Sequence, residues 1–237
     1  MTVADAQRPQ ICFLHIPKTA GTSLTELLVD GVGSDRVCPA GTLVDYDAMS
    51  DEELAHYDLL KGHFDYALRA RLRRPALFLT MLRDPVDRVV SLYHQWRRSP
   101  VPPGGLGGEA VAKRYDLADF IDCGQTVVEW RCVNAQVYQI ADGVRQARDP
   151  EKDRKMLELA KAHLRDIAFV GLSERFAESV TRLCARFGWP VPTTMPNANV
   201  SAEAGSINPA VRKWIEERNA ADRALYDFAI DLIDGRT

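Results

Sequence analysis

The chain has 237 residues, of which 46% are hydrophobic and 27% are charged. A chain of this length can bury one substantial core without dividing, so we predict a single domain over residues 1–237. The net charge of −3 excludes nucleic-acid binding through bulk positive charge, so we expect no nucleic-acid partner and any anion site must be local.

The five cysteines are scattered, without a C-x-x-C pair or a zinc-ligand spacing. This pattern indicates free thiols in a reducing compartment. The first ten residues lack an apolar signal core, and no apolar run approaches the length of a membrane span. We therefore expect a soluble, cytoplasmic protein with no membrane partner.

The first predicted unit lies between residues 11 and 24 and consists of a strand, a tight turn and a helix. The strand ends near His15, the turn spans residues 17–21, and the helix begins at Thr22 or Ser23. Such a turn leaves backbone N–H groups unpaired beside the positive end of a helix dipole. We therefore predict an anion cradle at this corner of the fold.

The side chains of this turn favour a bound phosphate or sulfate. Lys18 brings an ammonium group to the turn, and Gly21 lets the backbone close around an oxyanion. The candidate anion-binding residues are Lys18, Thr19, Ala20, Gly21, Thr22 and Ser23. Because the lysine precedes the glycine, the spacing differs from the G-x-x-x-x-G-K-[ST] pattern and disfavours a generic nucleotide triphosphatase. An ordinary helix start with a capping threonine is the alternative.

A short helix and a second strand are predicted next. Ser50 and Glu53 match a capping box, which predicts a short acidic helix within an otherwise irregular stretch. Residues 57–63 indicate a strand that runs into a Gly-His turn. His63 would then lie at a strand end, where open α/β sheets bind their ligands.

A third strand and the helix after it repeat the design of the first unit. Residues 76–82 are almost entirely apolar, as expected of a strand that is covered on both faces. Asp84 suits the N-cap of a helix and Pro85 its first position. Arg83 would then lie at the carboxyl end of the strand, and Ser91 two turns into the helix, off its buried stripe.

The second half of the chain is predicted to be mostly helical. Residues 99–109 are rich in proline and glycine and are expected to form a mobile loop, either a lid over the acceptor site or a long surface loop. A strand is predicted over residues 167–172. Helices are predicted over residues 117–121, 128–141, 151–164, 209–219 and 221–231, with one more capped by Ser173. The alternation of strands and helices predicts an α/β fold with a central parallel sheet between helical layers.

The two strand-to-helix corners can act on one ligand. If the first and third strands are neighbours, the Lys18 turn and Arg83 with Ser91 hold two separate anionic groups of that ligand. On spacing alone, a surface ion pair of Arg83 with Asp84 or Asp87 is the alternative.

Two segments carry a resemblance to a known family: His15-Ile-Pro-Lys-Thr-Ala-Gly-Thr-Ser23 and Leu82-Arg-Asp-Pro-Val-Asp-Arg-Val-Val-Ser-Leu-Tyr93. Together they resemble the signatures of sulfotransferases that use 3′-phosphoadenosine 5′-phosphosulfate (PAPS). The branch resembled is that of the heparan sulfate 2-O-sulfotransferases and their soluble bacterial relatives. The similarity continues at residues 62–64 and 169–176, and weakly at 197–201 and 219–226, so it covers most of the chain.

The resemblance implies a P-loop-like α/β/α sandwich and a nucleotide site. It implies that residues 18–23 bind the 5′-phosphosulfate and that Arg83 and Ser91 bind the 3′-phosphate. Asn199 and Ser201 fall where the family closes a loop on the nucleotide, although this stretch lacks the family's usual basic residue. Because this chain has no transmembrane helix like that of the membrane-anchored eukaryotic members, the resemblance points to a bacterial cytoplasmic enzyme.

The activity implied is transfer of a sulfuryl group from PAPS, the co-substrate, to an acceptor hydroxyl on a carbohydrate or a small metabolite. His63 matches the catalytic base of the branch, with a turn histidine bonded to the backbone as the alternative. Lys18 would stabilise charge on the leaving phosphate oxygen. No metal is expected, since a sulfuryl group carries less negative charge than a phosphoryl group. Asp65 is a candidate for orienting His63 or sharing its role, and His94 is a second candidate base.

Two other functions stay open at this point. A P-loop kinase acting on a small metabolite would need Mg²⁺ ligands such as an aspartate at a strand end. A non-catalytic nucleotide-binding protein could use the same fold. The acceptor itself is not identified, although four aromatic residues are candidates for lining its pocket: Trp96, Tyr115, Trp130 and Trp189.

Overall fold

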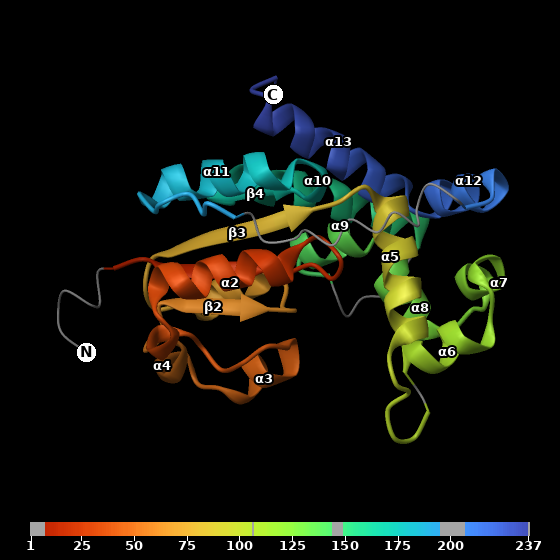
Figure 1. Cartoon of the computed structure of the whole chain (residues 1–237), viewed down its shortest axis with the longest axis horizontal. Coiled ribbons are helices and arrows are strands. Elements are labelled where there is room, and N and C mark those ends of the chain that lie inside the picture. Colours follow the sequence, from red (N-terminus) through yellow and green to blue (C-terminus); the bar gives the residue numbers. More distant parts are fainter. Residues whose placement is uncertain (1–7, 106, 144–148, 195–206, 237) are drawn as a thin grey trace.

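The computed structural model describes residues 8–105, 107–143, 149–194 and 207–236. The sheet formed by these residues has four strands in the order β2-β1-β3-β4, and each neighbouring pair is parallel. The strands are β1 (Gln10–Leu14), β2 (Leu59–Gly62), β3 (Ala76–Leu82) and β4 (Phe169–Leu172). The predicted α/β class with a central parallel sheet is confirmed (Figure 1).

Helices surround this sheet. In chain order they are α2 (Gly21–Val32), α3 (Leu43–Ala48), α4 (Asp51–Leu54), α5 (Pro85–Arg98), α6 (Gly108–Arg114), α7 (Leu117–Asp122), α8 (Thr126–Cys132), α9 (Ala135–Ile140), α10 (Pro150–Asp166), α11 (Phe176–Phe187), α12 (Pro209–Arg218) and α13 (Ala220–Ile233). Short 3₁₀ turns are η1 (Ser34–Arg36), η2 (Tyr66–Arg71) and η3 (Ser173–Arg175). In the part of the chain that the structure describes, no helix is both long and apolar enough to span a membrane.

The alternation of side chains along β1 divides the core into two layers. Ile11 and Phe13 pack with α2 and α11 on one face of the sheet. Cys12 and Leu14 pack with α9, α10 and α13 on the other face. The result is a three-layer sandwich, as predicted.

A third hydrophobic cluster lies beside the sandwich rather than on the sheet. It is built from α5, α6, α7, α8 and α12, and its buried members include Val89, Phe120 and Ile215. In Figure 1 these helices stand to the right of the sheet, beyond the tips of the strand arrows. We call this group the side cluster.

Local capping signals predicted several elements correctly. The Asp84 carboxylate accepts hydrogen bonds from the N–H groups of Val86 and Asp87 at 2.9 and 3.1 Å, so α5 begins at the predicted proline. The Ser50 N–H donates to the Glu53 carboxylate at 2.7 Å, and the Glu53 N–H donates to the Ser50 hydroxyl at 3.2 Å, which confirms the capping box of α4.

Other local predictions were wrong. The stretch before α4 contains a further helix, α3, which opens with its own capping box of Thr42 and Asp45. The helix predicted over residues 128–141 is divided at Asn134, whose φ of 46° is left-handed, into α8 and α9. Ser173 does not cap α11: its hydroxyl donates to the carbonyl oxygen of Leu82 at 3.2 Å.

Smaller differences concern the two predicted loops around the site. Helix α2 begins at Gly21, one residue before the predicted start. The last two residues of the predicted loop 99–109 are already helical, because α6 begins at Gly108. The mobility of that loop stays a prediction.

Candidate active site

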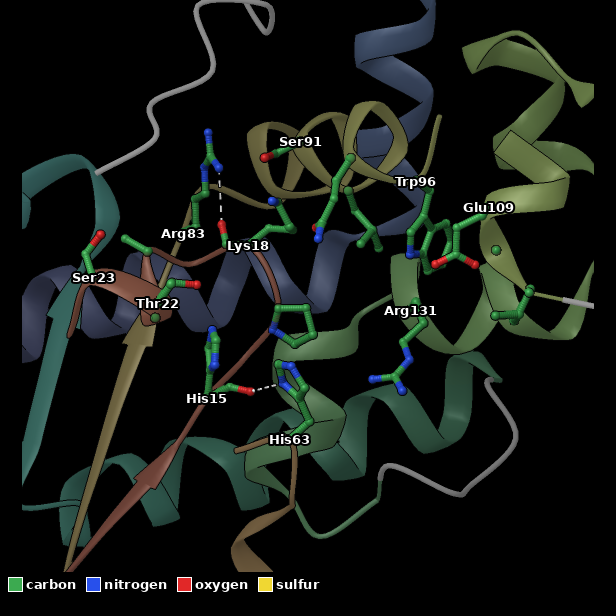
Figure 2. Close-up of a pocket in the computed structure, with 18 residues that line it drawn as sticks. His15, Lys18, Thr22, Ser23, His63, Arg83, Ser91, Trp96, Glu109 and Arg131 are labelled. Atoms are coloured by element: carbon green, nitrogen blue, oxygen red, sulfur yellow. Dashed lines mark hydrogen bonds between the residues drawn. The ribbon is translucent and has the colours of Figure 1, made fainter. Parts of the chain in front are cut away.

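The carboxyl ends of β1, β2 and β3 lie side by side and bring three candidate residues together. Because β1 pairs with both β2 and β3, the turn after β1 lies between the residues that follow the other two strands. Lys18, His63 and Arg83 consequently line one cavity of about 490 Å³ (Figure 2). A cavity of this size is typical of small-molecule sites.

The turn after β1 has the backbone geometry of an anion-binding nest. Lys18 and Ala20 both have positive φ, at 72° and 64°, which is uncommon for residues other than glycine. Left-handed residues of this kind aim successive N–H groups at one point. Thr22 and Ser23 line the cavity with this backbone, whereas Thr19 is buried and its hydroxyl donates to the Ile16 carbonyl oxygen at 2.9 Å. Thr19 therefore holds the turn closed and can offer a ligand only its N–H group.

Gly21 is required by a close approach to His15. A Cβ at this position would lie 2.0 Å from Cδ2 of the His15 ring, which is a severe overlap. The ring stacks on Phe13 with a centroid distance of 5.5 Å and lies 4.6 Å from the ring of His63. His15 thus forms the floor between the turn and the second strand end.

Two cations, Lys18 and Arg83, lie close together on the side of the cavity that the turn after β1 forms. The Arg83 guanidinium donates to the carbonyl oxygen of Lys18 at 3.1 Å, and its Nε lies 4.0 Å from the Glu174 carboxylate. Burial lowers the pKa of Lys18, and the charges of Arg83 and Arg98 lower it further. Burial likewise lowers the pKa of Arg83. A bound anion would relieve the repulsion between these two cations.

The alternative ion pairs of Arg83 are taken by other residues. Asp84 pairs with Arg223, and Asp87 lies 3.8 Å from Arg212. The Arg83 side chain is instead directed to the turn after β1, as Figure 2 shows.

Ser91 is a correction to the expected helix face. It is buried, although the sequence pattern placed it off the buried stripe of α5. It nevertheless lines the cavity together with Arg83, so the two residues reach the same ligand space as predicted.

The hydrogen bond of His63 fixes its tautomer. Its Nδ1 lies 2.8 Å from the backbone carbonyl oxygen of His15. A carbonyl oxygen only accepts, so Nδ1 carries the proton and Nε2 of the neutral ring is left as the acceptor. Burial lowers the pKa of His63; the hydrogen bond to His15 opposes this, and the charges of Arg131 and Lys61 add to it. The imidazole is therefore neutral at pH 7.

Asp65 and His94, the other two candidates for proton transfer, lie elsewhere. The group that accepts from His63 is the His15 carbonyl, whereas Asp65 lines a separate cavity with Asp47 and Asp142. His94, on α5, packs edge-on against Tyr93 and is absent from the described lining of the active-site cavity.

The far end of the cavity contains residues that sequence reasoning missed. Glu109 from α6 and Arg131 from α8 line it opposite the turn after β1, beside Trp96 (Figure 2). Burial lowers the pKa of Arg131, and the charge of Arg88 lowers it further. Neither Glu109 nor Arg131 lies in a motif, so the sequence offers no local signal for them.

Trp96 lines the cavity as predicted, and the other three aromatic candidates have different surroundings. Trp189 stacks on Phe187 with a centroid distance of 4.8 Å, within the core on the α2 face. Tyr115 packs on the side cluster, and Trp130 is 43% exposed.

Two predicted nucleotide contacts, Asn199 and Ser201, lie outside the described residues. Within the described ranges, no group of three or more His, Cys, Asp or Glu residues is arranged to hold a metal ion.

Known proteins resemble this chain over most of its length. A family model described as "Sulfotransferase family" matches residues 2–229. Mouse heparan-sulfate 6-O-sulfotransferase 3 is 29% identical over 97% of this chain and 58% of its own length. Zebrafish heparan-sulfate 6-O-sulfotransferase 1-B is 27% identical over 95% of this chain and 66% of its own length. The chain thus spans less than two thirds of the length of these relatives.

A solved structure has the same fold. The crystal structure of a mouse sulfotransferase complexed with PAP superposes with a TM-score of 0.50, at 14% identity, over 94% of this chain and 90% of that one. The likeness confirms the predicted α/β architecture.

Proposed function

Because the chain belongs to the sulfotransferase family, we propose that it transfers a sulfuryl group from PAPS to an acceptor hydroxyl. The observation that carries the proposal is the convergence of the Lys18 turn, Arg83 and His63 on one cavity. These residues supply, in order, an anion nest, a second cationic site and a neutral base.

We call the end of the cavity beside the turn after β1 the donor end. It suits a nucleotide with two anionic groups. Lys18 and the N–H groups of its turn are proposed to bind the 5′-phosphosulfate, because the left-handed residues form a nest and Gly21 admits no side chain. Arg83 and Ser91 are proposed to bind the 3′-phosphate, since a guanidinium fork matches phosphate geometry. PAPS, when bound, supplies the sulfuryl group that is transferred.

His63 is proposed as the general base. Its Nε2 accepts the proton of the acceptor hydroxyl, while Nδ1–H keeps its hydrogen bond to the His15 carbonyl oxygen and so stabilises the imidazolium that forms. Lys18 and the N–H groups of the turn stabilise the negative charge that develops on the leaving phosphate oxygen.

A carbohydrate or small-metabolite hydroxyl is proposed as the acceptor. The far end of the cavity offers the flat face of Trp96 and the charged groups of Glu109 and Arg131. The curated relatives are named as heparan-sulfate 6-O-sulfotransferases, whereas the sequence motifs resemble the 2-O branch. The proposal therefore specifies a hydroxyl acceptor without a ring position.

The test is a transfer assay with PAPS carrying a labelled sulfuryl group and a panel of sugars, glycosaminoglycan precursors and small hydroxylated metabolites. We expect label in at least one acceptor, and binding of the 3′,5′-bisphosphate product (PAP) by calorimetry. Mg²⁺-dependent ATP hydrolysis without any response to PAPS would instead identify a kinase. PAP binding without transfer, unaffected by His63→Ala, would identify a non-catalytic nucleotide-binding protein.

A further inference from the structure

Helix α9 presents two buried glutamines to the backbone of the active site. Gln136 exchanges two hydrogen bonds with the main chain of Arg83: its Oε1 accepts from the Arg83 N–H at 3.0 Å, and its Nε2 donates to the Arg83 carbonyl at 2.9 Å. Gln139 donates from Nε2 to the carbonyl oxygens of His15 and Phe64, at 3.0 and 2.8 Å. Residues three apart share a helix face, so one face of α9 contacts the ends of β1, β2 and β3.

Gln139 is linked to His63 through one atom to which both are hydrogen-bonded. The His15 carbonyl oxygen accepts from Gln139 Nε2 and from His63 Nδ1, so both of its lone pairs are used. The second bond of Gln139 goes to Phe64, the residue after His63. Gln139 therefore ties the acceptor that orients His63 to the main chain that carries His63.

The contact of Gln136 holds the main chain just after the end of β3. Its amide bonds both the N–H and the carbonyl of Arg83, as the partner residue in a hydrogen-bonded antiparallel pair does. The guanidinium of Arg83 then reaches the Lys18 carbonyl from a fixed backbone.

The position of α9 is set by tertiary contacts. A helix of six residues has little stability of its own. The buried carboxylate of Asp222, on α13, accepts from the N–H groups of Gln136 and Val137 at 3.2 and 2.8 Å. The Asp222 carboxylate thus caps the N-terminus of α9, the helix that carries both glutamines.

We propose that Gln139 and Gln136 are positioning residues with separate duties: Gln139 orients His63 through the His15 carbonyl, and Gln136 fixes the backbone from which Arg83 reaches the nucleotide. This rests on the proposed function for the roles of His63 and Arg83. Loss of the Gln139 amide then acts on turnover, and loss of the Gln136 amide acts on nucleotide binding.

The chain offers a matched control in Gln10. It is fully buried, as Gln136 is, and Gln139 is 4% exposed. Like Gln139, Gln10 donates from Nε2 to two carbonyl oxygens, those of Leu54 and Tyr57, at 2.8 and 2.7 Å. It lies at the opposite end of β1 from the active site. Gln10→Met therefore removes two hydrogen bonds of the same kind without touching the site.

The experiment compares Gln139→Met, Gln136→Met and Gln10→Met in the full chain, by steady-state kinetics with PAPS and by calorimetry with PAP. We expect Gln139→Met to lower kcat by 10- to 100-fold, on the order of the cost of a misplaced catalytic group, with the Kd of PAP unchanged. We expect Gln136→Met to raise the Kd of PAP by about tenfold, the equivalent of roughly one lost hydrogen bond. Gln10→Met should change neither quantity, although it lowers stability.

A second measurement is independent of catalysis. In ¹⁵N NMR spectra of the PAP-free protein, the His63 ring should be protonated at Nδ1 in the wild type and in Gln10→Met, and should become a tautomer mixture in Gln139→Met. Should Gln139→Met not fold, Gln139→Asn keeps an amide but shortens its reach, and the same changes are expected.

Two results would overturn the inference. One is an unchanged His63 tautomer and kcat in the Gln139 variant; the other is a set of changes that Gln10→Met reproduces. A protein that transfers no sulfuryl group to any acceptor would refute the proposed function alone, since the NMR comparison and the PAP titration still decide whether the glutamines position His63 and Arg83.

Discussion

The Nδ1 of His63 lies 2.8 Å from the backbone carbonyl oxygen of His15, the residue that follows β1 and leads into the anion-binding turn. The contact leaves Nε2 of His63 as the proton acceptor. It also ties His63, the proposed base, to the strand that carries the turn, so His63 and the turn are positioned by the same main chain.

Replacing His63 separates chemistry from binding. We expect His63→Ala to lower kcat by roughly 10²–10⁴-fold, the usual contribution of a general base, and to leave the Kd of PAP unchanged. Transfer kinetics and calorimetry measure the two quantities. His56→Ala, at an exposed position, is the control. A normal kcat in His63→Ala would remove the base from this residue.

The pH dependence of kcat/KM follows from the lowered pKa of His63, because this ratio reports the titration of the free enzyme. Burial holds this pKa below its ordinary value of 6.5, so the ring loses its proton at a lower pH than a free histidine. The ratio kcat/KM should therefore be constant at neutral pH and fall on the acid side with an apparent pKa below 6.5. A pH profile of kcat/KM measures this limb. An acid limb centred above 6.5 would contradict the assignment.

The two cations of the donor end should each contribute to nucleotide affinity. We expect Lys18→Ala and Arg83→Ala to weaken PAP binding by about 10- to 100-fold, since a hydrogen bond to a charged group contributes roughly 1.5–3 kcal/mol. Calorimetry gives the two values. Arg73→Ala is a matched control, because Arg73 is a 55% exposed cation that pairs with Glu52. Affinities equal to that of the control would place the nucleotide elsewhere.

Gly21 tests the close packing under the turn. In Gly21→Ala the new Cβ would meet the His15 ring at 2.0 Å, so the ring or the turn must move. We expect a loss of about 1–3 kcal/mol in the free energy of unfolding, as for other overpacked sites, together with weaker PAP binding. Gly41→Ala is the control, because a Cβ there meets no atom within 4 Å. Chemical denaturation of both variants checks this, and equal stabilities would contradict it.

His15 should make stability depend on pH. Burial lowers its pKa in the folded state to about 3, from an ordinary value of 6.5, and the charges of His63 and Lys61 contribute. Between these values the unfolded chain binds more protons than the folded chain, so the free energy of unfolding rises with pH. The contribution is complete above pH 6.5 and is lost as the pH falls towards 3. His15→Phe keeps a ring without a titrating group, and denaturation across this range should show a flatter dependence. An unchanged slope would rule out His15 as its source.

The parts of the fold that the sequence predicted correctly are those decided locally. The start of α5 depends on Asp84 and Pro85, and the start of α4 on Ser50 and Glu53, all within one helical turn. The missed helix α3 also carries a local signal, the capping box at Thr42. The sequence gives a weaker signal for the division at Asn134. An asparagine can adopt the left-handed conformation seen here, but it also occurs within unbroken helices.

The candidate site likewise contains residues that the sequence predicted and residues that it did not. The Lys18 turn, Arg83 and His63 are adjacent to the ends of predicted strands, and the strand order β2-β1-β3, which the sequence left as a condition, brings them together. Glu109 and Arg131 reach the cavity through the packing of short helices, which no local pattern encodes. Ser91 shows a related limit, because helical periodicity distinguishes buried from exposed faces but not a core from a ligand cavity.

The two ends of the cavity are built by different parts of the fold. Helices α6 and α8, which supply Glu109 and Arg131, pack into this cluster and not into either layer on the sheet. The nest and its floor belong to the sandwich instead. On the proposed function, sequence change within α6 to α8 would alter the proposed acceptor end of the cavity, while the turn after β1 and Arg83, proposed to hold the nucleotide, would stay unchanged. An engineer seeking a new product would exchange that segment and leave the strand ends alone.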